Sequence, residues 1–141
     1  MPDAPEIDKN YIDRRSDGWI SKVEQLYADI KNALKSDSDV SFKSEQYMVM
    51  QEELMEKYGV PPKKVPIFDM FVGNQLKASF KPVGLWVVGA KGRIDILTRE
   101  GSYILVDLGE DDAHPDWKVF TPKNRKKGSE FNANFIETLV H

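Results

Sequence analysis

The stretch LWVVGAKGRIDILTREGSYILVDL, residues 85–108, decides the fold. Its side chains alternate in character, and glycine-bearing segments interrupt it at 89–92 and at 99–101. A period of two residues is typical of strands, so the stretch predicts three of them, at 85–88, 93–98 and 102–108. The short glycine-bearing loops predict that these strands form an antiparallel meander.

The loop lengths predict the register of this meander and therefore its two faces. A three-residue loop at 99–101 would set Thr98 opposite Ser102, and a four-residue loop at 89–92 would set Val88 opposite Arg93. One predicted face is aliphatic and forms the core; it holds Leu85, Val87, Ile94, Ile96, Ile104, Val106 and Leu108. The other predicted face is mixed; it holds Trp86, Val88, Arg93, Asp95, Leu97, Tyr103, Leu105 and Asp107.

The mixed face is the first candidate for function. An antiparallel sheet can leave one face in water, and aromatic and charged side chains together are typical of binding surfaces. The candidate binding residues are Trp86, Arg93, Asp95, Tyr103 and Asp107. A purely structural interpretation stays open, in which Arg93 and Asp107 form a cross-strand ion pair and the aromatic rings pack beneath another part of the chain.

The chain on either side of this stretch continues the β pattern. Segments 67–72 and 75–80 flank Gly73-Asn74, a two-residue hairpin signal, and Lys81-Pro82 then predicts a turn. A short strand is expected at 117–121. Apolar residues at helical spacing predict a final helix over about 130–140.

The first half of the sequence is predicted to be mainly helical. Apolar residues from Trp19 to Leu34 trace one helical stripe, which predicts a helix over 19–35. Residues 1–16 are expected to be a flexible tail and 17–141 one domain. Residues 45–58 suit a helix that ends at Gly59, although Tyr47–Met50 could instead be a strand preceded by Val40 and Phe42.

These elements predict an α+β fold. N-terminal helices would pack on an antiparallel β-meander or half-barrel of about five to six strands, closed by a short C-terminal helix. Composition adds limits: the 141 residues carry a net charge of −3 and include no cysteine. We therefore expect a cytoplasmic protein without disulfides, without a membrane span, and without a cofactor or metal.

Part of the meander suggests an enzyme. The run GRIDI at 92–96, followed by YILVDLG at 103–109, resembles the core of the PD-(D/E)xK nuclease family. That resemblance implies that Asp95 and Asp107 hold Mg²⁺, which activates water for phosphodiester hydrolysis. The chain departs from the family where its lysine would stand, because Gly109 lies two places after Asp107.

A basic segment is the second candidate for function. We expect this segment to form a loop that can contact phosphates, close to acidic residues at 110–112. Its basic residues are Lys118, Lys123, Arg125, Lys126 and Lys127. The sequence as a whole favours a non-enzymatic protein-binding or assembly module whose partner is another protein. The alternative is a nucleic-acid-directed protein, either a binder or a metal-dependent phosphodiesterase.

Overall fold

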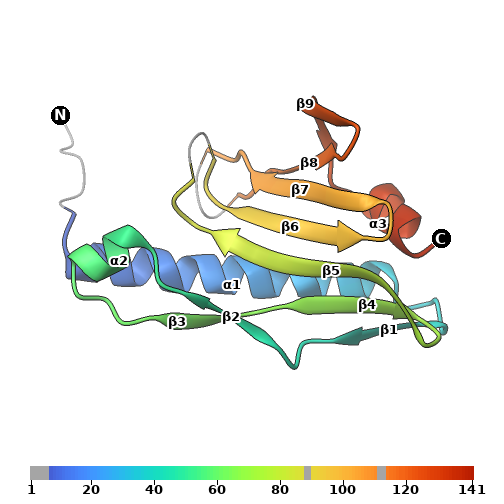
Figure 1. Cartoon of the computed structure of the whole chain (residues 1–141), viewed down its shortest axis with the longest axis horizontal. Coiled ribbons are helices and arrows are strands. Elements are labelled where there is room, and N and C mark those ends of the chain that lie inside the picture. The colour runs from blue at the N-terminus through green and yellow to red at the C-terminus, as the bar shows by residue number, and fades with distance from the viewer. Residues whose placement is uncertain (1–6, 88–89, 111–113) are drawn as a thin grey trace.

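The computed structural model describes residues 7–87, 90–110 and 114–141. Its fold is α+β, as predicted: a long N-terminal helix, a seven-stranded antiparallel sheet, a two-stranded sheet and a short C-terminal helix (Figure 1). Val88, Asp111 and Asp112, which belonged to predicted features, lie outside the described residues. No helix in the described part of the chain is long and apolar enough to cross a membrane.

The large sheet has the strand order β1-β4-β5-β6-β7-β8-β9. All neighbouring pairs are antiparallel. Its strands are β1 (Val40–Lys43), β4 (Phe68–Val72), β5 (Gln75–Gly84), β6 (Arg93–Thr98), β7 (Gly101–Asp107), β8 (Trp117–Thr121) and β9 (Asn124–Glu130). Strands β2 (Tyr47–Met50) and β3 (Lys63–Pro66) form the small sheet.

Helix α1 (Lys9–Ala33) begins ten residues before the predicted start at Trp19. The Asp8 side chain accepts a hydrogen bond from the amide of Tyr11 and caps the first turn. Ile12 and Ser16 are fully buried on the stripe that continues through Trp19. The expected flexible tail is therefore wrong from residue 9 onward, because the first two turns already pack against the rest of the protein.

The segment between α1 and β4 corrects a second expectation. Residues 45–58 do not form one helix, because Tyr47–Met50 form strand β2 and helix α2 spans only Glu53–Lys57. The strand alternative for Tyr47–Met50 is thus confirmed. Gly59 follows α2 with a φ of 73°, the left-handed conformation that its missing side chain permits at a helix end.

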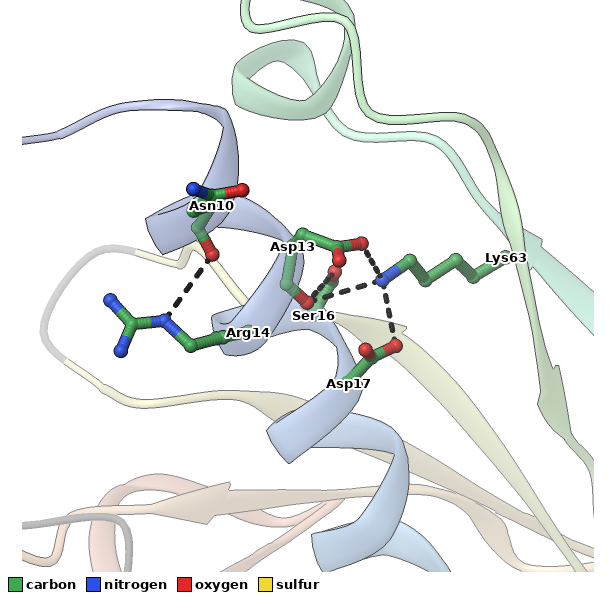
Figure 2. Close-up of polar contacts among 6 residues, drawn as sticks. All are labelled: Asn10, Asp13, Arg14, Ser16, Asp17 and Lys63. Carbon is green, nitrogen blue, oxygen red and sulfur yellow. Dashed lines mark hydrogen bonds and ion pairs between the residues drawn. The ribbon is translucent and has the colours of Figure 1, made fainter.

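Lys63 ties the small sheet to α1, as Figure 2 shows. Its ammonium lies 2.6 Å from the Asp13 carboxylate and 2.7 Å from the Asp17 carboxylate, and it also donates to the backbone oxygen of Asp13. Ser16 donates its hydroxyl to that same oxygen over 2.8 Å. Asp13 and Asp17 are one helical turn apart, so the single ammonium of Lys63 can form ion pairs with both carboxylates.

Strand β5 is longer than predicted. The Gly73-Asn74 hairpin is confirmed, with Val72 opposite Gln75. The strand then passes through Pro82, where a turn was expected, and continues to Gly84 with an irregularity at that point. Proline cannot donate to the ladder, which explains why the pairing shifts there. Residues 85–87 and 90–92 lie between β5 and β6, and 85–87 belong to none of the named strands, so the predicted strand at 85–88 is not formed over its described part.

The pairing of β6 with β7 differs from the prediction by one residue. Thr98 lies opposite Gly101, so the connecting loop has two residues, Arg99 and Glu100, instead of three. Asp95 is consequently opposite Ile104, and Arg93 is opposite Val106. Because side chains alternate, this shift turns every residue of β7 to the face opposite to the one expected.

The C-terminal elements complete the sheet and its cover. Strand β8 matches its predicted bounds, whereas the segment expected to be a basic loop largely forms strand β9. Helix α3 (Ala133–Val140) begins later than predicted, where the Asn132 side chain caps it by accepting from the Phe135 amide. Trp117 ends the ladder with β7, opposite Asp107.

The core lies between α1 and one face of the large sheet, and α1 runs roughly along the strands (Figure 1). Aromatic rings bind the layers together: Tyr27 of α1 stacks on Phe68 at 4.6 Å, and Phe80 meets Phe68 edge to face at 5.8 Å. Helix α3 adds Phe135, whose ring lies 5.4 Å from that of Tyr103. The face toward α1 is called the inner face below, and the opposite one the outer face.

Candidate binding face on the sheet

The outer face of the central strands is open to solvent in the described part of the chain. Its side chains follow from the register, because residues that alternate with the buried Ile94, Ile96 and Leu105 must point outward. They include Ser79 and Lys81 of β5, Arg93, Asp95 and Leu97 of β6, Ile104 and Val106 of β7, and Lys118 and Phe120 of β8. Most of them are partly exposed, which distinguishes this face from the buried inner one.

Apolar side chains occupy the centre of the outer face. Ile104 lies opposite Phe120 across the β7–β8 pair, and Leu97 extends the apolar area on β6. Phe120 lies over Gly128 of β9, where a Cβ atom would come within 2.9 Å of the ring. The ring therefore needs a glycine beneath it. A partly exposed apolar centre that no helix of the described residues covers is typical of a surface that binds a partner.

Charged side chains surround this centre. Arg93 Nε lies 2.9 Å from the Asp95 carboxylate, so these two charges neutralise each other. Lys118 forms ion pairs with Glu130 and Asp116 at the other margin. Lys81 lies opposite Asp95 on the neighbouring strand, but the Asp95 carboxylate already accepts from Arg93. The outer face thus has the apolar centre and polar rim of a protein interface.

A hollow of about 490 Å³, the outer groove, crosses β4, β5 and β6 beside the apolar centre. Its lining includes Asp69, Lys77, Ser79, Lys81, Leu97 and Arg99. Ser79 Oγ donates to the Asp69 carboxylate over 2.5 Å, which fixes that carboxylate at the base of the groove. The pairing shift between β4 and β5 puts Leu76 opposite Phe71 and leaves Lys77 without an opposite residue, and both line the groove.

The five residues predicted to share the mixed face do not share it. Arg93 and Asp95 are on the outer face, as expected. Tyr103 and Asp107 point inward, the result of the shorter β6–β7 turn. Trp86 lies in the β5–β6 connection, where it packs against the core and its amide donates to the Glu52 carboxylate over 3.1 Å.

Asp107 is a buried anion with a complete set of partners. Its carboxylate accepts from Lys22 Nζ at 2.6 Å, from the Gly109 amide at 2.8 Å and from the Asp116 amide at 2.9 Å. Burial by itself would raise the pKa of the Asp107 carboxyl, but these three donors outweigh it and hold that pKa below its ordinary value. Asp107 therefore fastens the β7 end to α1 and to the following loop.

The nuclease geometry is not formed. Asp95 points to the outer face and Asp107 to the inner one, so the predicted diagonal pair of carboxylates is wrong. Asp107 is also neutralised by Lys22, which leaves it no free charge for a divalent ion. The described residues contain no group of three or more histidine, aspartate or glutamate side chains placed to hold a metal.

The predicted basic loop becomes a basic edge of the sheet. Arg125, Lys126 and Lys127 lie on β9, which pairs with β8 alone, and all three are exposed. Arg125 donates to the backbone oxygen of Ser102 over 2.7 Å. Lys123 lies in the turn before β9, and Lys118 belongs to the outer face, so the five basic residues do not form one cluster.

The sequence prediction missed the residues that shape the outer groove. Lys81 was expected in a turn, and Lys77 and Arg99 carried no motif. One signal was available: the two-residue loop Arg99-Glu100 would have turned Ile104 and Val106 outward beside Leu97. The bulge at Leu76 and Lys77 has no comparable sequence signal.

Comparison with protein-family models, curated proteins and solved structures finds no match to this chain.

Proposed function

We propose that this protein is a protein-binding module that docks its partner on the outer face of the sheet. The supporting observation is the apolar centre formed by Leu97, Ile104 and Phe120 on a face left open to solvent, with charged residues around it. A partner that covered these side chains would gain binding free energy of about 25 cal/mol for each Å² of apolar area removed from water. Ion pairs at the rim would then fix its orientation.

The proposal is tested with a partner captured from an extract of the host and then purified. We expect the double variant Leu97→Lys/Ile104→Lys to bind that partner at least about tenfold more weakly than the wild type, because hot-spot residues cluster at interface centres. Val49→Lys is the matched control, since Val49 is 66% exposed and belongs to β2 of the small sheet, outside the outer face. Titration calorimetry with the purified pair measures the difference.

Two results would contradict this function. One is equal affinity of the purified partner for the double variant and the wild type. The other is the absence of any captured protein that binds in one-to-one proportion after purification. Circular dichroism checks the fold of each variant, and Leu97→Thr/Ile104→Thr, which keeps strand-favouring residues, replaces the lysine pair if that pair unfolds.

A second candidate is nucleic-acid binding along β9. Its supporting observation is the exposed row of Arg125, Lys126 and Lys127 at the sheet edge. Binding of this kind would weaken steeply with salt and would fall in Lys126→Gln/Lys127→Gln. Filter binding to single- and double-stranded DNA and RNA at low salt measures it, and no retention of any of them would rule it out.

A further inference from the structure

We propose that the outer groove receives an extended acidic segment of the partner protein. In this segment two carboxylate side chains stand four residues apart, with an apolar side chain midway between them. The inference depends on the proposed function and specifies the chemistry of the partner. It is drawn from the charge, the spacing and the apolar content of the groove.

The outer groove is positively charged. The groove lining contains three cations, Lys77, Lys81 and Arg99, and one carboxylate, that of Asp69. Within the described residues none of the three cations forms an ion pair, whereas Asp69 accepts the Ser79 hydroxyl. The whole chain carries a net charge of −3, so this groove is a positive region on a negative protein. Such a region attracts anionic partners and repels cationic ones.

The cations of the groove are spaced to match an extended peptide. Lys77 and Lys81 are four residues apart on one strand, which corresponds to about 13 Å at the rise of an extended chain. Arg99 follows Thr98, which pairs with Ala78, so Arg99 stands at the Lys77 end. An extended peptide has the same rise per residue, so its side chains at positions i and i+4 would reach both cationic ends.

An apolar side chain, that of Leu97, lies between the two cationic ends of the groove. Leu97 is opposite Ser79, midway between Lys77 and Lys81 along β5. The side chain at position i+2 of an extended segment points the same way as those at i and i+4. An apolar residue at i+2 would therefore lie over Leu97. A second contact is available at Leu76, which is 51% exposed at the Lys77 end.

A second hollow, next to the outer groove, limits how far the acidic residues of the partner can extend past Arg99. It measures about 230 Å³, shares Leu76, Lys77 and Arg99 with the outer groove, and includes the Glu100 side chain. A carboxylate placed beyond Arg99 would face Glu100 and be repelled. The acidic residues of the partner therefore lie between Lys81 and Arg99, and the chain that continues past Arg99 carries no carboxylate.

The experiment uses fluorescent synthetic peptides and the full chain. The probe has glutamate at two positions, leucine midway between them, and serine elsewhere. Matched peptides replace both glutamates with glutamine or with lysine. Fluorescence anisotropy should show saturable binding of the glutamate peptide that weakens as salt increases, and at least about tenfold weaker binding of the other two. Equal binding of the glutamate and glutamine peptides would overturn the inference.

Protein variants locate the site. Lys81→Glu and Arg99→Glu should each weaken binding of the glutamate peptide by about fivefold or more, because like charges then face each other. Lys35→Glu makes the same change in net charge just beyond α1 and should leave binding unchanged. Lys81→Gln and Arg99→Gln give smaller losses and serve if a glutamate variant unfolds. Affinity that depends only on net charge would place the peptide elsewhere.

The two proposals can fail separately. If Leu97→Lys/Ile104→Lys loses the purified partner but no peptide shows a preference for glutamate, the outer face binds and only the acidic segment is wrong. If the partner binds that variant as tightly as the wild type, the proposed function is wrong as well.

Discussion

Lys22 Nζ lies 2.6 Å from the Asp107 carboxylate, and neither side chain is more than 6% exposed. The pair joins α1 to the end of β7, 85 residues later in the chain. Desolvation of two buried charges is costly, so the pair contributes stability only while it is intact and its remaining lone pairs are satisfied. The amides of Gly109 and Asp116 satisfy them on the Asp107 side.

Removal of one member of this pair should destabilise the protein more than removal of both. We expect Lys22→Met to lower the free energy of unfolding by about 3 kcal/mol, because it leaves a buried carboxylate without its cation. Adding Asp107→Asn should recover part of that loss, since the asparagine oxygen still accepts from the two amides. Urea denaturation of both single variants and the double variant measures the coupling, and additive losses would contradict it.

The stabilising effect of Asp107 should disappear in acid. Its pKa is lowered in the folded protein, so its contribution is complete above the unfolded value of about 3.9 and is lost as pH falls through the folded value. The difference in unfolding free energy between wild type and Asp107→Asn should therefore be constant near neutrality and shrink below about pH 4. Urea midpoints across pH measure it. A difference that persisted unchanged in strong acid would contradict the assignment.

Lys63 should stabilise the contact between the small sheet and α1 only modestly. Its carboxylate partners Asp13 and Asp17 are 50% and 65% exposed, so solvent screens the attraction. We expect Lys63→Met to cost about 1 kcal/mol and to speed amide exchange in β2 and β3 more than in β6. Lys64→Met is the neighbouring control, and equal acceleration in all strands would contradict a local role.

High pH should reproduce the loss of this contact. Burial tends to lower the pKa of Lys63, but hydrogen bonds to Asp13 and Asp17 outweigh it and raise that pKa above its ordinary value. The contribution is therefore complete below the unfolded value of about 10.4 and fades as pH rises through the folded value. The unfolding free energies of wild type and Lys63→Met should converge in strong alkali.

Two glycines should respond to alanine in opposite directions. A Cβ at Gly92 would collide with the buried Trp19 ring, and its φ is 142°, so Gly92→Ala should cost about 3 kcal/mol or more. Gly18 lies in the middle of α1 with nothing near its Cβ position, so Gly18→Ala should stabilise by about 0.5–1 kcal/mol. Thermal unfolding measures both. A tolerated Gly92→Ala would show that the Trp19 ring can move aside.

Local sequence signals predicted the fold class and several elements. The Gly73-Asn74 hairpin, the strand 117–121 and the stripe from Trp19 onward each follow from short-range chemistry. The start of α1 could also have been found, because Ile12 and Ser16 continue that stripe at spacings of four and three residues. The polar residues around them concealed the pattern.

The candidate site was less predictable, because an error of one residue in a predicted loop length turns every side chain of the next strand to the opposite face. The sequence prediction assigned Gly101 to a three-residue loop, but in the structure it is the first residue of β7, with a φ of 132°. That single residue decides whether Tyr103 or Ile104 meets solvent. The irregularity at Leu76–Lys77 has no local sequence signal, whereas the one at Pro82–Gly84 could have been expected from Pro82, which cannot donate to the ladder.

An open sheet of seven strands has two unpaired borders, and β9 is one of them. The unpaired backbone groups of an edge strand can template a strand from another molecule, which is one route to aggregation. In β9 the amides of Lys126 and Lys127 already donate to the Asn124 side chain. The positive side chains of Arg125, Lys126 and Lys127 would repel their counterparts on an approaching copy. Such repulsion disfavours the pairing of two copies along this border.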